Sequence, residues 1–301
     1  MSPLEAISGL ALRYLSPERM AALRSLYLNG RAHLHPLMSR VHGTFDVNDL
    51  RLHLQQRIGD DFEILMVHSS VNHMSPMFVD SPLALVKMLM AWCGPNRTLA
   101  MPAFYFGDPD IGGAYATFSQ RPRFDLKRMP SQMGLTTELF RRMPGVMQSR
   151  HPVYRVAAFG PLAQALVRGH EAAEYPSGVD TPFDFMANHA TRIIGIGKTF
   201  QVLTQAHHVE GVMGDAFPVP RGNGAGLAVT VVDGKEEVIA RLTGRSPQGE
   251  FDIWRLRNIM SRDRLQEWKF HSVPMFATRA ADVTDDLVNA AKKGITLYGK
   301  H

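Results

Sequence analysis

Apolar residues recur along this chain in short runs that alternate with amphipathic segments. Residues 62–67 (FEILMV) and 98–101 (TLAM) are apolar runs of the kind that form buried strands. Between them, residues 81–93 predict a helix, which Gly94-Pro95-Asn96 ends. This strand–helix–strand order indicates an α/β fold, in which helices flank a largely parallel central sheet.

The same rhythm continues downstream. We predict helices at residues 47–58, 133–143, 161–171 and 202–213, and strands at residues 153–159 and 192–197. Residues 104–130 and 174–184 show no clear period, and irregular segments as long as the first are usually functional.

The two ends of the chain differ from its middle. Residues 227–232 and 237–242 flank Asp233-Gly234, which predicts a small β-hairpin, and the tail after it reads as mostly helical. Near the start, Ser16 and Pro17 have the residue types of a helix cap and a first helical position. We therefore expect an N-terminal helical extension, residues 1–45, and a single α/β domain, residues 46–301.

Composition narrows the choice of partners and compartment. Acidic and basic residues are mixed along the whole chain, so the net charge of +5 forms no stripe for nucleic acid. The single cysteine, Cys93, fits a reducing compartment. No apolar stretch reaches the ~18 residues of a membrane span, and the first residues lack the basic region of a signal peptide. We expect a cytoplasmic protein that binds neither membrane nor nucleic acid.

The pattern Thr204-x-x-His207-x-x-Glu210 is the most informative polar cluster. Residues three apart on a helix share a face, so a hydroxyl, an imidazole and a carboxylate would stack there. The cluster follows the strand at residues 192–197, and ligands of α/β proteins bind beyond strand ends. The alternative is a polar helix face without function. His208 would point about 100° away and serve in packing or at the surface.

Other motifs fail on spacing. Gly195-Ile-Gly197-Lys198-Thr199 would need a glycine at Arg192 to be a P-loop, and no G-x-S-x-G elbow is present. His207, His208 and Glu210 are wrongly ordered for a zincin helix, although a metal site that combines them with His271 is an alternative. We predict no metal.

Several short segments carry a family resemblance through their shared order. They are His68-Ser69-Ser70, Met101-Pro102-Ala103, Ser149-Arg150-His151-Pro152, Asp180-Thr181-Pro182 and the run from Ile193 to Glu210. Residues 47–214 resemble in this way the aminoglycoside 3-N-acetyltransferase family, whose members transfer an acetyl group from acetyl-CoA to an amine. The resemblance implies an acyltransferase with acetyl-CoA as co-substrate and an amino sugar or similar amine as acceptor.

The chain also departs from the family pattern. Ala103 stands where the family has threonine, Gln148 where it has arginine, and two extra residues separate Gly197 from Thr204. The acyl-transfer core is therefore expected to be shared more closely than the acceptor pocket. The unmatched N-terminal extension and the tail after Gly214 are candidates for a homodimer contact or a pocket lid.

The resemblance implies a direct attack of the amine on the thioester, with His207 as general base. Histidine suits this task because its ordinary pKa of ~6.5 lies near working pH. Glu210 would orient the imidazole or bind the cationic acceptor. Thr204 would hydrogen-bond the imidazole or the oxyanion.

The resemblance also implies positions for the substrates. Ser69, Ser70, Met101 and Ala103 would line the groove for the coenzyme. The stretch with basic residues between Arg121 and Arg155, above all the segment with Ser149 and His151, would meet its phosphates. Asp180 would attract the acceptor amine. The plainer alternatives are a helix cap for Ser69 and Ser70, a loop-fixing hydrogen bond for His151 and a turn cap for Asp180.

Two other functions compete with acetyl transfer to an amino sugar. One is an acyltransferase of the same fold with another acyl-CoA or acceptor, and the other is a non-catalytic binding module. An intact Thr204, His207 and Glu210 argue against the module.

Overall fold

The structure is a computed structural model that describes residues 34–299. Residues 34–42 form a helix, which belongs to the expected N-terminal extension. The helix start expected at Ser16 and Pro17 lies outside the described residues.

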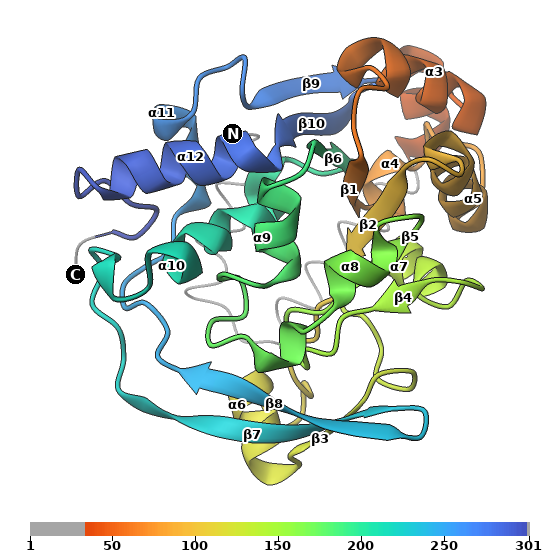
Figure 1. Cartoon of the computed structure of the whole chain (residues 1–301). Helices are drawn as coiled ribbons and strands as arrows, with labels where there is room; N and C mark the ends of the chain where they lie inside the picture. Colours follow the sequence, from red (N-terminus) through yellow and green to blue (C-terminus); the bar gives the residue numbers. More distant parts are fainter. Residues whose placement is uncertain (1–33, 300–301) are drawn as a thin grey trace.

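A seven-stranded sheet runs through the described part of the chain in the order β4-β5-β2-β1-β6-β10-β9 (Figure 1). Its three central strands, β1 (Ile64–Ser69), β2 (Thr98–Pro102) and β6 (Thr191–Ile196), are parallel, with Leu65 opposite both Leu99 and Arg192. Every residue of β1 and β2 is buried, as expected of strands that are covered on both faces.

The outer strands make the sheet mixed. β5 (Val156–Phe159) pairs antiparallel with β2, and β4 (Met147–Gln148) pairs antiparallel with β5. On the other side, β10 (Val273–Arg279) pairs antiparallel with β6, and β9 (Gln266–Phe270) antiparallel with β10. Parallel neighbours are thus confined to the centre. The prediction of a central sheet flanked by helices is confirmed.

The prediction of a mostly helical tail was wrong for the segments that form β9 and β10. Their short connection is possible because His271 and Ser272 take positive φ values of 47° and 64°. The strands then extend the sheet beyond β6. Only α11 (Leu256–Ile259), the 3-10 helix Ile253–Arg255 and α12 (Ala280–Ala291) are helical there among the described residues.

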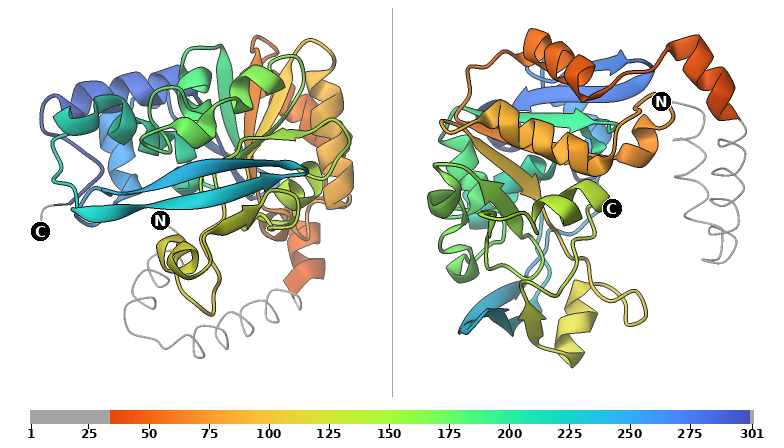
Figure 2. Two further views of the ribbon diagram at one scale, coloured as in Figure 1. Left: turned by 60° about the horizontal axis from the view of Figure 1, so that its bottom comes forward. Right: turned by 90° about the vertical axis from the view of Figure 1, so that its right-hand side faces the viewer.

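Helices cover both faces of the sheet (Figure 2). α3 (Val47–Ile58), α5 (Pro82–Cys93) and α7 (Leu135–Phe140) pack with one core cluster, which includes Leu65 and Met101. α8 (Ala163–Val167), α9 (Pro182–Ala187), α10 (His208–Met213) and α12 pack with the other, which includes Met66 and Ala100. Successive strand residues thus enter different cores.

A three-stranded sheet forms a separate layer, at the bottom of Figure 1. β7 (Gly224–Asp233) and β8 (Glu236–Gly244) make an antiparallel hairpin that turns after Asp233, and β3 (Arg123–Asp125) runs parallel to β7. α6 (Ala114–Gln120) packs beneath them. A core of its own, which includes Tyr105, Phe118 and Val229, supports this layer.

The helix predicted at residues 202–213 is broken. Phe200–Val202 and Thr204–His207 are 3-10 turns, Leu203 between them is extended, and only His208–Met213 is α-helical. The predicted helix at 161–171 is likewise cut short, because Arg168 is extended and Gly169 is left-handed with φ 75°. The remaining short helices are α4 (Val71–Met74), His170–Ala172 and Gly214–Ala216. No helix within residues 34–299 is long and apolar enough to cross a membrane.

Candidate active site

A first cavity of about 370 Å³ lies where the central parallel strands end. Its walls include His68 and Ser69 from β1, Pro102 and Phe104 from the end of β2, and Lys198 just after β6. Ligands of open α/β sheets bind beyond the carboxyl ends of such strands. Most of the remaining wall is apolar, so the cavity suits a largely apolar ligand with a few polar groups.

A second cavity of about 460 Å³ lies beside the first, between α10 and the β7–β8 hairpin. Its walls include His151, Tyr175, Glu210, Arg221 and Arg245. Tyr154 lines both cavities. The two cavities therefore adjoin at the Tyr154 side chain.

His207 and Glu210 form a hydrogen-bonded pair beside Tyr154. His207 lines the first cavity and Glu210 the second, and 2.9 Å separate His207 Nδ1 from Glu210 Oε1. The 3-10 turn that ends at His207 continues into α10, so the spacing of three brings the two side chains together. In a neutral imidazole, a carboxylate at Nδ1 fixes the proton there and leaves Nε2 as the acceptor.

Distant residues hold this pair in place. The Tyr298 hydroxyl donates to the same Glu210 oxygen over 2.6 Å, and the Phe251 ring stacks on the His207 ring with centroids 4.7 Å apart. Tyr154 meets His207 edge to face at 6.2 Å. Burial and the Glu210 carboxylate raise the pKa of Tyr298, so its hydroxyl stays a donor. Nothing in the local sequence pattern points to these three aromatic residues.

Thr204 is buried and lines the first cavity with His207. His208 faces away from both cavities: its Nδ1 lies 2.5 Å from the Ser177 carbonyl oxygen, and burial lowers its pKa. Of the two roles predicted for His208, packing or surface, the structure shows packing.

The alternative metal site is not assembled. His271 contacts the carbonyl oxygen of His42 at the β9–β10 turn instead of joining His207. Within residues 34–299, no group of three His, Cys, Asp or Glu side chains could hold a metal ion.

The end of β1 presents polar atoms to the first cavity. The Ser69 hydroxyl and both ring nitrogens of His68 are buried without a hydrogen-bond partner among the described residues. Burial and the charge of Lys198 lower the pKa of His68 to about 3, so the ring is neutral. Ser70 begins α4, but its side chain makes no capping hydrogen bond and it lines neither cavity. We missed His68 as a site residue, although it directly precedes Ser69.

Met101 and Ala103 do not line the groove as predicted. Both are fully buried in the core cluster on the other face of the sheet, where Met101 contacts the Thr137 hydroxyl. Their neighbours Pro102 and Phe104 line the first cavity instead. Neighbouring residues of an extended segment point to opposite sides, so Met101 and Ala103 face this core while Pro102 and Phe104 face the cavity.

Ser149 and His151 occupy different places. Ser149 is fully buried outside both cavities, where its hydroxyl accepts from the Val156 amide and contacts His170. His151 lines the second cavity, so the structure separates it from the strand-end groove predicted for the coenzyme. Its Nδ1 also accepts from backbone amides, the loop-fixing bond given as the alternative.

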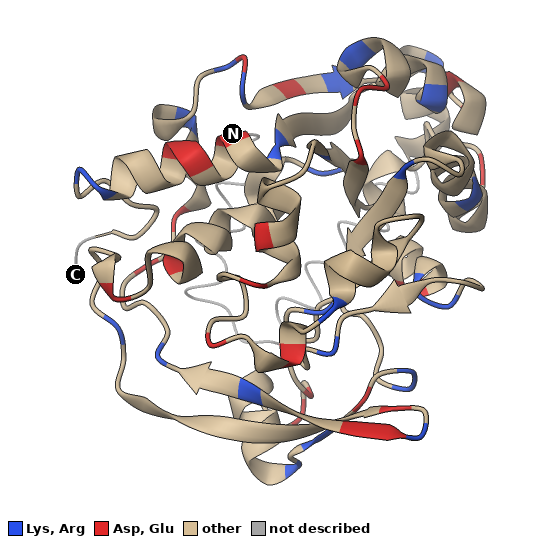
Figure 3. Ribbon diagram, in the orientation of Figure 1, with Lys and Arg blue, Asp and Glu red and all other residues tan. Residues whose placement is uncertain are grey.

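The arginines between residues 121 and 155 are largely satisfied within the protein. Arg150 pairs with Asp233 and Glu236, and Arg141 with Glu138. Arg155 is fully buried and donates to three backbone carbonyl oxygens. Basic and acidic residues are interspersed along the ribbon, as Figure 3 shows. This stretch therefore offers less free positive charge than the sequence suggested.

Asp180 is exposed, has a positive φ of 59° and lines neither cavity. Thr181, not Asp180, caps α9 by accepting from the Asp184 amide. Neither the acceptor role nor the capping role predicted for Asp180 is supported.

Known proteins share both the sequence pattern and the fold. A family described as aminoglycoside 3-N-acetyltransferase matches residues 66–291. Aminoglycoside N(3)-acetyltransferase IX of Micromonospora chalcea is 32% identical over 124 residues, which cover 40% of this chain and 43% of that protein. Aminoglycoside N(3)-acetyltransferase IV of a Salmonella species is 35% identical over 104 residues, 35% of each chain. The aligned segments thus span less than half the length of these relatives.

Solved structures extend the likeness over most of the chain. AAC-VIa bound to sisomicin superposes with a TM-score of 0.66 at 22% identity, over 84% of this chain and 99% of that one. AAC-IIIb with CoASH superposes with a TM-score of 0.67 at 17% identity, over 85% and 100%. These neighbours share the fold. Since the family match covers most of the chain and includes the His207–Glu210 pair, this protein belongs to the aminoglycoside 3-N-acetyltransferase family.

Proposed function

We propose that the protein is a CoA-dependent N-acetyltransferase that moves an acetyl group from acetyl-CoA to a primary amine. The main support for this proposal is the hydrogen-bonded His207–Glu210 pair where the two cavities meet. The names of the relatives favour an amino sugar or aminoglycoside-like acceptor.

The first cavity fits the pantetheine and acetyl end of acetyl-CoA. Its apolar walls, which include Phe104 and Phe251, would exclude water from the thioester. The unpartnered Ser69 hydroxyl and His68 ring would regain hydrogen bonds from the pantetheine amides, since buried polar groups without partners are costly.

His207 would act as the general base. Its Nε2 would take a proton from the acceptor nitrogen as that nitrogen bonds to the thioester carbon. The C–S bond then breaks, and the thiolate of CoA leaves and takes a proton. Glu210 would stabilise the imidazolium through Nδ1, and the buried Thr204 hydroxyl is the nearest candidate to hold the oxyanion or the ring.

Acetyl-CoA turnover by His207→Ala tests this role. We expect kcat to fall by roughly 10²–10⁴-fold, while thermal stabilisation by CoA remains. His189→Gln is the matched control, because His189 lines neither cavity. His208→Ala is not a suitable control, since loss of its buried hydrogen bond would lower stability. Full activity in His207→Ala would refute the assignment.

The alternatives separate in the same assay. A relative that uses a longer acyl-CoA would release thiol faster with that donor than with acetyl-CoA. A non-catalytic module would be stabilised by CoA but release no thiol with any amine.

A further inference from the structure

The second cavity presents more positive than negative charge to a ligand. Arg221 and Arg245 line it together with one carboxylate, Glu210. The Oε1 atom of Glu210 already accepts from His207 and Tyr298. A polycationic acceptor would need carboxylates that this wall lacks.

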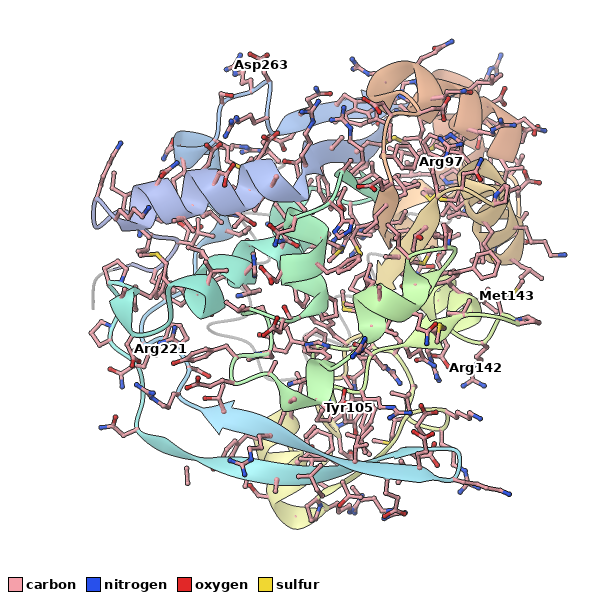
Figure 4. All side chains as sticks on the ribbon, viewed as in Figure 1. Arg97, Tyr105, Arg142, Met143, Arg221 and Asp263 are labelled. Carbon is pink, nitrogen blue, oxygen red and sulfur yellow. The ribbon has the colours of Figure 1, made fainter. Side chains whose placement is uncertain are left out.

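Arg221 carries a charge that no carboxylate of residues 34–299 neutralises. Among the described residues, its guanidinium donates only to the backbone carbonyl oxygens of Glu210, Gly214 and Arg245, and its Nε finds no partner there. The charged group lies over the Tyr175 ring, 4.4 Å from the centroid. The side chain sits between α10 and the hairpin, as Figure 4 shows. Arg245, by contrast, pairs with the exposed Asp215 at 3.0 Å.

His151 adds an unused hydrogen-bond donor to the same cavity. Its Nδ1 accepts from the backbone amides of Val153 and Tyr154 at 3.2 and 2.9 Å, so the ring proton must lie on Nε2. Burial and the nearby His170 hold its pKa well below the usual range, so the ring is neutral. The buried Nε2–H finds no acceptor among the described residues. An oxygen of a bound ligand would satisfy it.

Tyr154 supplies a further donor. Burial and the Glu210 charge raise its pKa to about 12, so the phenol keeps its proton at neutral pH. Arg221, His151 and Tyr154, which all line the second cavity, thus offer N–H or O–H donors or an unpaired positive charge. An anionic oxygen group of a ligand could interact favourably with all three.

We infer that the acceptor carries an anionic oxygen group, such as a carboxylate or phosphate, in addition to the amine that is acetylated. Arg221 and His151 bind this group in the second cavity, and the amine faces His207. The preferred substrate is an amine with an acidic group rather than a polycationic aminoglycoside. This inference rests on the proposed acetyl transfer and names its substrate class.

Matched pairs of amines test the inference in the wild-type protein. Glucosamine is compared with glucosamine 6-phosphate, and 1,5-diaminopentane with lysine, by thiol release from acetyl-CoA. We expect at least a tenfold higher kcat/KM for the member of one pair that carries the acidic group, and the pair that responds tells phosphate from carboxylate. A preference for the members without an acidic group, or for sisomicin, would overturn the inference but leave the acetyltransferase assignment intact.

Arg221→Gln is expected to remove the preference within that pair, through a higher KM for the anionic amine. Arg123→Gln is the matched control, since Arg123 pairs with Glu237 on the outside of the hairpin. Arg245 is exposed, so Arg245→Gln should leave the fold intact and reduce the preference severalfold. This variant replaces Arg221→Gln as the test if Arg221→Gln does not fold. A rise in KM for acetyl-CoA alone in Arg221→Gln would assign the anion site to a coenzyme phosphate and overturn the inference.

Absence of turnover with every amine would count against the proposed function instead. Binding then decides the inference: the anionic member of a pair should stabilise the wild type in a thermal shift, and Arg221→Gln should lose that stabilisation. Equal shifts with both members would overturn it.

Discussion

Glu210 Oε1 accepts two hydrogen bonds, one from a residue three positions away and one from a residue 88 positions away. The Tyr298 hydroxyl, at 2.6 Å, limits how far the carboxylate can turn from His207. If His207 is the base that we propose, Tyr298 is a positioning residue for it, without lining either of the two cavities.

Tyr298→Phe should lower kcat about tenfold, because a hydrogen bond to a charged group contributes roughly 1.5–3 kcal/mol and part of it supports the orientation of His207. KM for acetyl-CoA should stay unchanged, since the first cavity keeps its walls. Steady-state kinetics of the variant measures both constants. An unchanged kcat would show that Phe251 and α10 suffice to orient the ring.

For individual site residues, the sequence was informative only where the interacting residues are close to each other along the chain. The spacing of His207 and Glu210 survived a change from α-helix to 3-10 turn, because residues three apart are close in either. Tyr298 and Phe251 could not be found, since their approach depends on how the tail packs. Met101 and Ala103 were misplaced because every residue of β2 is buried, and its sequence does not say which side chains near its end meet the cavity.

The β7–β8 hairpin is fastened to the main domain near its turn. Arg150 bonds to Asp233 and Glu236, the residues on either side of that turn. Arg150 precedes His151, so the same segment joins the hairpin to the wall of the second cavity. The position of the hairpin thus affects the width of that cavity.

Arg150→Gln should loosen the turn end of the hairpin without unfolding the protein. We expect faster hydrogen exchange in residues 230–240 and a severalfold higher KM for the amine, with KM for acetyl-CoA unchanged. Arg264→Gln is a suitable control, because Arg264 pairs with Asp286 on α12, far from the hairpin in the fold. Equal exchange in wild type and variant would contradict this view of the ion pairs.

Elements in the first two thirds of the chain were easier to predict than those in the tail. β1, α5 and β2 follow one another closely, and their apolar runs have the lengths of single strands and helices. β9 and β10 pair with each other and with β6, whose sequence lies far upstream. Pro274 inside β10 also weakens its strand signal. Their pairing is a property of the assembled sheet, which no local window contains.

Three buried histidines make the stability of the whole molecule depend on pH. Burial lowers the pKa of His68 to about 3 and that of His170 to about 4, and it lowers that of His151 as well. In the unfolded chain these rings titrate near 6.5. Below that pH the unfolded state binds protons that the native state does not bind. The free energy of unfolding therefore decreases as the pH is lowered from about 6.5 toward the native pKa values.

The free energy of unfolding should therefore decline as the pH falls from about 6.5 to 4, by up to about 1.4 kcal/mol per pH unit for each histidine, and the melting temperature should decline with it. His68→Leu should make the decline shallower, and it should raise stability at pH 7 by removing two buried ring nitrogens without partners. Calorimetry across this range measures both effects, with the exposed His42→Gln as control. A wild-type melting temperature that stays flat to pH 4 would contradict the neutral, buried state of these rings.

The hairpin wall of the second cavity has a consequence for how such enzymes diversify. Leu242, Thr243 and Gly244 of β8 line that cavity, while the layer that carries them rests on a core separate from those of the main sheet. Under the proposed function, substitutions in this wall would change the acceptor side and leave the walls of the first cavity and the core clusters around β1 as they are. Acceptor preference could then differ between related proteins that keep the same His207–Glu210 pair.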